Sequence, residues 1–97
     1  MPWLTFQLSS AQEAAGDGMK VLDQFTQLYV RLGGPTDVAL FTHQDPGEDH
    51  ITYWLTPATE QRAAVIVRLL GAQPGQAPPA NATLLAGVTG KRVNDFK

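Results

Sequence analysis

Apolar and polar side chains alternate at the start of the chain, where Leu4, Phe6 and Leu8 fall on one side and the residues between them on the other. A period of two is typical of a strand with one buried face. The segment from Trp3 to Leu8 is therefore predicted to form the first strand.

Residues 37–42 and 51–56 are two further short segments rich in β-branched, leucine and aromatic side chains. The polar stretch between them contains Pro46 followed by Gly47, which is a turn signal. The two segments are therefore predicted to pair as a β-hairpin.

A long helix is predicted between the first strand and the hairpin, with a capping box at Ser10 and Glu13 and an end at Gly33. Two glycines in its first half predict a kink or a later start near Asp17, and the pattern leaves this start open. One face of the helix is apolar, with residues spaced by three and four: Leu22, Phe25, Leu28, Tyr29 and Leu32.

A second helix is predicted to begin at Thr56-Pro57, because threonine caps free amides and proline suits the first helical position. Gly71 is the expected end. Residues 73–81, with their prolines and glycine, are expected to run extended without regular structure, and Thr83 to Val88 to form the last strand. The expected buried stripe of the helix is Ala63, Ile66, Val67 and Leu70.

The predicted order of strand, helix, strand, strand, helix, strand resembles the ferredoxin-like βαββαβ pattern. It predicts an α+β fold, with a four-stranded antiparallel sheet and two helices on one face. Residues 1–88 are expected to form a single domain, followed by a polar, frayed tail at 89–97.

Length and charge restrict the partners of this chain. With 97 residues it builds one modest core, so that self-association would add to its stability. Seven Lys and Arg against nine Asp and Glu give a net charge of −2, which disfavours nucleic acid. Residues 50–55 also lack the basic residue and glycines that an RNA-recognition strand carries at the corresponding place.

Composition also excludes several kinds of chemistry. The chain has no cysteine, so disulfides, thiolate metal sites and cysteine nucleophiles are absent. Its paired glycines lack the Lys-Ser or Lys-Thr of a phosphate loop, and no cofactor is expected. With no membrane-spanning run and no signal-peptide pattern, the protein is expected to be soluble and cytoplasmic.

The sheet face away from the helices is the main candidate binding surface. If the aliphatic residues of the first and third strands face the helices, both tryptophans lie on the open face. If the faces are inverted, both are core residues, and the orientation of the strand at 37–42 is left open. The residues predicted to form this interface are Trp3, Thr5, Thr52 and Trp54.

The hairpin loop carries five side chains that are metal ligands by atom type: His43, Asp45, Glu48, Asp49 and His50. Their spacing matches no known metal motif, and acidic loop tips are ordinary solvated turns. We therefore expect no metal site here.

These observations predict a small binding or interaction protein that forms a homodimer through the open sheet face, with a small molecule or a protein as further ligand. The alternative is a small, oxygenase-like enzyme of the dimeric ferredoxin-like kind that uses His43 or His50 as acid or base.

Overall fold

The computed structural model describes residues 3–34, 37–56 and 59–87. Within these ranges the chain forms an α+β fold with one antiparallel sheet, as the sequence predicted. The elements in chain order are β1 (Trp3–Ser9), α1 (Ser10–Ala14), α2 (Asp17–Arg31), β2 (Leu40–His43), β3 (His50–Leu55), α3 (Glu60–Leu70), β4 (Gln73–Gly75) and β5 (Thr83–Ala86).

The sheet has five strands in the order β4-β1-β3-β2-β5, so the prediction of a four-stranded sheet is wrong. The strand that the prediction missed is β4, in the segment expected to lack regular structure. It pairs with β1 at the sheet edge, where Pro74 lies opposite Leu4. An edge strand tolerates proline because its missing N–H can point away from the neighbouring strand.

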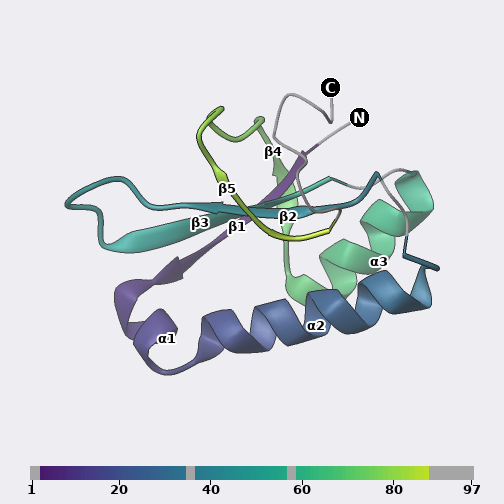
Figure 1. The fold of residues 1–97 in the computed structure, drawn as a ribbon, viewed down its shortest axis with the longest axis horizontal. Coiled ribbons are helices and arrows are strands. Elements are labelled where there is room, and N and C mark those ends of the chain that lie inside the picture. The colour runs from purple at the N-terminus through teal and green to yellow at the C-terminus, as the bar shows by residue number, and fades with distance from the viewer. Residues whose placement is uncertain (1–2, 35–36, 57–58, 88–97) are drawn as a thin grey trace.

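The predicted last strand is β5, which lies at the opposite edge of the sheet beside β2. It ends at Ala86, and Val88 lies outside the described residues. The connection from β4 to β5 passes over the face of the sheet opposite the helices (Figure 1).

The core lies between the sheet and helices α2 and α3, which cover the same face (Figure 1). Alternation on β1 and β3 brings Leu4 and Leu55 together as register partners at this face, with 2% and 0% of their surface exposed. Phe25 from α2 and Ile66 from α3 complete the same cluster. Burial of these apolar side chains holds the two layers together.

The first predicted helix is divided into α1 and α2 at Gly16, whose φ of 92° is left-handed and suits glycine. The capping box lies one residue earlier than predicted. Ser9 accepts from the Gln12 amide, and the Gln12 side chain accepts from the Ser9 amide. Glu13 is thereby freed from a capping role.

The predicted start of the second helix at Thr56 is wrong. Helix α3 begins at Glu60, and its N-cap is Thr59, whose Oγ1 accepts from the Arg62 amide at 3.2 Å. Thr56 is instead buried beyond the end of β3 and accepts a hydrogen bond from Ala39. Pro57 lies outside the described residues.

The end of α3 agrees with the prediction, since Gly71 is its C-cap with a φ of 68°. Its buried stripe is narrower than predicted: Ile66 is fully buried, whereas 39% of Val67 is exposed. Consecutive helical residues point about 100° apart. A helix that contacts the sheet through a narrow stripe therefore cannot bury both.

The predicted tail at 89–97 lies outside the described residues. Among the helices of the described ranges, none has the length and apolar character needed to cross a bilayer.

Candidate functional site

Both tryptophans lie on the outer face of the sheet, which is the face that helices α2 and α3 do not cover. They come from β1 and β3 and pack around Phe41 and Ala39, which are fully buried beneath them. The Trp3 and Phe41 rings meet edge to face, with centroids 6.0 Å apart. Trp54 lies beside Phe41 as its register partner. The outer face thus has an aromatic centre.

The orientation of β2, which the sequence left open, follows from this arrangement. Val38 and Leu40 belong to the cluster under the helices, and Ala39 and Phe41 belong to the outer cluster. Phe41 faces outward because it is aligned with Trp54 across the ladder.

The two threonines predicted for this surface are engaged within the sheet. Thr5 donates through Oγ1 to the Tyr53 carbonyl at 2.9 Å. The side-chain amide of Gln7 donates through Nε2 to Thr52 Oγ1 at 3.4 Å. Thr5 also lies against Gly75 of β4, where a Cβ would meet its methyl group. These contacts fix the surface around the tryptophans.

The chain itself covers part of the aromatic centre. Ala82 and Leu84, from β5 and the residue before it, pack against the outer cluster, and both tryptophans are half-buried. The large apolar side chains that are most exposed among the described residues lie elsewhere: Met19, Val30, Val67 and Leu85.

Beside Trp54 the outer face is hollowed into a polar cavity of about 520 Å3, closed on one side by Pro79 and Asn81. His43 and His50 both line it, and each imidazole is paired with a carboxylate. His43 Nε2 lies 2.8 Å from Asp45 Oδ1, and His50 Nε2 lies 2.9 Å from Glu48 Oε2. The remaining polar lining residues are Gln7 and Thr52.

The loop side chains are not gathered around one point. No group of three or more His, Asp or Glu side chains among the described residues is arranged to hold a metal ion. Asp49, the fifth candidate ligand, does not line the cavity; its backbone carbonyl accepts from the Ser10 amide at 3.0 Å. Each histidine instead has a carboxylate neighbour, an arrangement that orients an imidazole for proton transfer.

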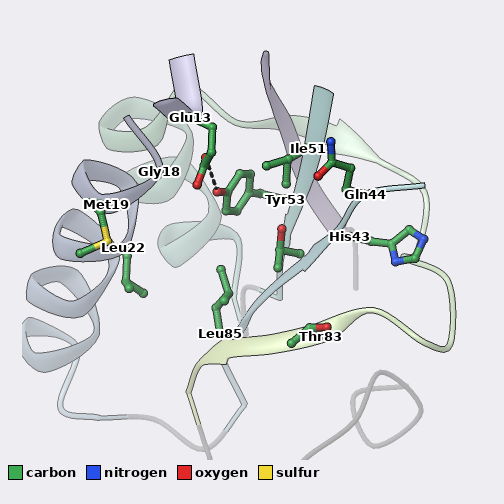
Figure 2. A pocket seen from close by; sticks show the side chains of 11 residues that line it. Glu13, Gly18, Met19, Leu22, His43, Gln44, Ile51, Tyr53, Thr83 and Leu85 are labelled. Carbon is green, nitrogen blue, oxygen red and sulfur yellow. Dashed lines mark hydrogen bonds between the residues drawn. The ribbon is translucent and has the colours of Figure 1, made fainter. Parts of the chain in front are cut away.

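A second cavity lies on the other side of the sheet, between α1 and the start of α2 and the strands β2, β3 and β5. It has a volume of about 410 Å3. We refer to it as the inner cleft. Figure 2 shows Glu13 and Tyr53 pointing toward one another within it, with Met19 and Leu22 on the helix side and Leu85 on β5.

The polar end of the inner cleft is the pair of Tyr53 and Glu13. The Tyr53 hydroxyl donates to Glu13 Oε2 at 3.1 Å. Burial raises the pKa of Tyr53 to about 12, and the hydrogen bond to Glu13 and the charge of that carboxylate act in the same direction. The phenol therefore stays protonated and can donate a hydrogen bond over the whole neutral range.

Gly18 makes room for this pair. A Cβ at this position of α2 would meet the carboxylate of Glu13, so that a larger residue would require the end of the Glu13 side chain to move. Anionic groups near a helix N-terminus are stabilised by its dipole. Gly18, which lowered the predicted helix propensity, thus leaves space for the Glu13 carboxylate.

Sequence analysis did not single out Glu13 or Tyr53 as site residues. The pattern places Glu13 in a capping box, and Tyr53 only within the strand predicted at 51–56. The one available signal was Gly18, a costly residue in a helix whose role emerges only beside Glu13.

Comparison of the chain with protein-family models, with curated proteins and with solved structures gives no match.

Proposed function

We propose that this chain is a small binding protein that associates with a second copy of itself through the outer face of the sheet. The observation that carries the proposal is the position of Trp3 and Trp54. They come from strands far apart in the sequence, yet share the one sheet face that no helix covers. Tryptophan is enriched at the centres of protein interfaces.

A two-fold axis is the symmetry that we expect for this contact. In an isologous contact each face meets its own copy, so that every apolar side chain is buried twice. Both tryptophans are only half-buried in the single chain and retain surface for such a contact. The exposed Gln7 lies on the same face and lines one cavity with Trp54, so that the contact would include it.

The strand order supports a ferredoxin-like core within this fold. We infer that β1, α2, β2, β3, α3 and β4 form that core, because the strand order β4-β1-β3-β2 and the two helices on one face are those of the βαββαβ arrangement. On this interpretation β5 is an addition at the β2 edge. The predicted cytoplasmic location stays a prediction.

The experiment is light scattering on the full chain and on a charge variant. Gln7→Lys places a cation on the outer face, so that two lysines approach one another across an isologous interface. We expect a dimer of about 21 kDa for the natural sequence, twice the 10.5 kDa of one chain, and a monomer for the variant.

Gln24→Lys on the exposed side of α2 is the matched control, because it makes the same chemical change away from the outer face. It should leave the dimer intact. A monomeric natural protein at micromolar concentration would contradict the proposal, as would dissociation by both substitutions alike.

A second candidate function is proton-transfer catalysis in the polar cavity, in an oxygenase-like or other small enzyme. It is favoured by the two imidazoles that line one cavity, each beside its own carboxylate. In this interpretation His43 or His50 acts as the base.

The test is hydrolysis of 4-nitrophenyl acetate at neutral pH. If the cavity is catalytic, the protein should hydrolyse the ester faster than free imidazole does. This rate should fall at least tenfold in His43→Gln or His50→Gln, and it should stay unchanged in Asp49→Asn. A rate equal to that of free imidazole would count against this function.

A further inference from the structure

The inner cleft has two apolar walls that the chain leaves uncovered. Met19 on α2 is 64% exposed and Leu85 on β5 is 41% exposed, and both line this cleft. Leu22 and Ile51 continue the apolar lining. Large apolar side chains gathered around a hollow are typical of a ligand site, whereas scattered ones carry no such meaning.

Glu13 gives the cleft a negative end. It is the one Asp or Glu in the described lining, and no Lys or Arg lines the cleft within the described ranges. Tyr53 donates to Oε2, and no described residue donates to Oε1. A carboxylate has about four acceptor positions, so this group retains capacity for a further donor.

His43 does not supply a positive partner for Glu13. Although it borders the cleft, its ring points away from Tyr53 (Figure 2), and its Nε2 pairs with Asp45. Lys20 on α2 likewise pairs with Asp17, at 3.8 Å. Among the described residues, Glu13 thus has no cationic partner, and its Oε1 can accept from a ligand.

We propose that the inner cleft binds a small molecule made of a protonated primary amine and an unbranched or aromatic apolar body. The ammonium group donates to Glu13 beside the Tyr53 hydroxyl, and the apolar body lies between Met19 and Leu85. A cavity of about 410 Å3 matches small ligands. A carboxylate ligand is disfavoured because it would meet the charge of Glu13.

This inference is independent of self-association, because the inner cleft and the outer cluster lie on opposite faces of the sheet. Gln7→Lys, which is designed to separate the dimer, should leave amine binding unchanged. The two proposals can therefore fail separately.

The test uses three probes of equal chain length with different head groups: hexylamine, hexanol and hexanoate. Each is titrated at pH 7 into the isotopically labelled full chain, and amide chemical shifts are followed. Hexylamine is expected to bind with a Kd on the order of millimolar, as for a ligand of this size. The largest shifts should fall at residues 13, 18–22, 53 and 85, and hexanol and hexanoate should bind at least tenfold more weakly.

Glu13→Gln keeps an acceptor for Tyr53 but removes the charge, and it should weaken hexylamine binding about tenfold without affecting hexanol. Glu48→Gln makes the same change at the outer cavity and should have no effect. Met19→Lys introduces a cation at the exposed mouth of the cleft, and it should also weaken the amine while leaving Glu13 in place.

Several results would each overturn the proposal. They are equal binding of hexanoate and hexylamine, unchanged amine affinity in both Glu13→Gln and Met19→Lys, and amine-dependent shifts confined to residues outside the inner cleft. Absence of any saturable shift with hexylamine would do the same.

Discussion

The Tyr53 hydroxyl on β3 donates a hydrogen bond to Glu13 Oε2 on α1, over a distance of 3.1 Å and a separation of 40 residues. It connects the shortest helix to the middle strand of the sheet. The Tyr53 ring also stacks on Phe6 with centroids 4.9 Å apart. One side chain thus takes part in both the core and the polar end of the inner cleft.

The Tyr53 hydroxyl should make stability depend on alkaline pH. Its pKa is raised from 10.0 to about 12 in the folded protein, so folding favours the protonated form. That stabilisation is fully present below pH 10 and is lost as the pH rises toward 12. We expect a loss of about 1–2 kcal/mol in unfolding free energy, allowing for solvent access from the cleft.

Urea titrations between pH 9 and pH 12 would measure this loss, and Tyr53→Phe should flatten it. Tyr29 is the other tyrosine of the chain, so that in Tyr29→Phe the phenolate absorbance reports Tyr53 alone. A midpoint near 10 in that variant would contradict the prediction.

Gly18→Ala should disturb Glu13 rather than the helix. Alanine improves helix propensity by up to about 1 kcal/mol, but its Cβ displaces the carboxylate and costs a hydrogen bond of similar size. We therefore expect little net change in unfolding free energy, together with a lower pKa of Tyr53. In a Glu13→Ala background the same substitution should stabilise by about 0.5–1 kcal/mol, and a thermodynamic cycle of urea midpoints would measure this coupling.

Thr56→Val should destabilise the fold by about 1–3 kcal/mol, because it leaves the buried Ala39 amide without an acceptor. Thr56 Oγ1 accepts from that amide at 2.9 Å and donates to the Asp37 carbonyl at 3.1 Å. Thr56→Ser keeps the hydroxyl and should lose less. Equal urea midpoints for the two variants would show that the hydroxyl is not needed.

Thr59→Ala should cost about 1 kcal/mol, because it removes the N-cap of α3. Urea unfolding followed by circular dichroism would measure the change. Ala64→Ser, on the exposed side of the same helix, should have a smaller effect. A midpoint unchanged in Thr59→Ala would argue against a side-chain cap.

Calorimetry with Zn²⁺ should reveal no tight site in the hairpin loop. Each imidazole is already paired with one carboxylate, and no described group supplies three ligands. Ordering a loop around an ion adds a further cost. A stoichiometric, sub-micromolar isotherm that disappears in His43→Ala or His50→Ala would show the opposite.

Local patterns in the sequence were sufficient for much of the fold. Alternation at Leu4 and Leu8 predicted β1 and its buried face, and Gly71 predicted the end of α3. These features depend on neighbours within a few residues, where dihedral preference and side-chain periodicity act directly. The α+β class followed from their order.

Tertiary structure decided what local patterns could not. Thr59 caps α3, whereas the Thr56 hydroxyl accepts from the Ala39 amide, a residue 17 positions away. Pro74 forms part of a strand because β1 offers a free edge beside it. The pair of Glu13 and Tyr53, with the glycine that admits it, exists only after helix and sheet have packed. Contacts between residues 40 positions apart leave no periodic signal in the chain, because chain folding alone brings them together.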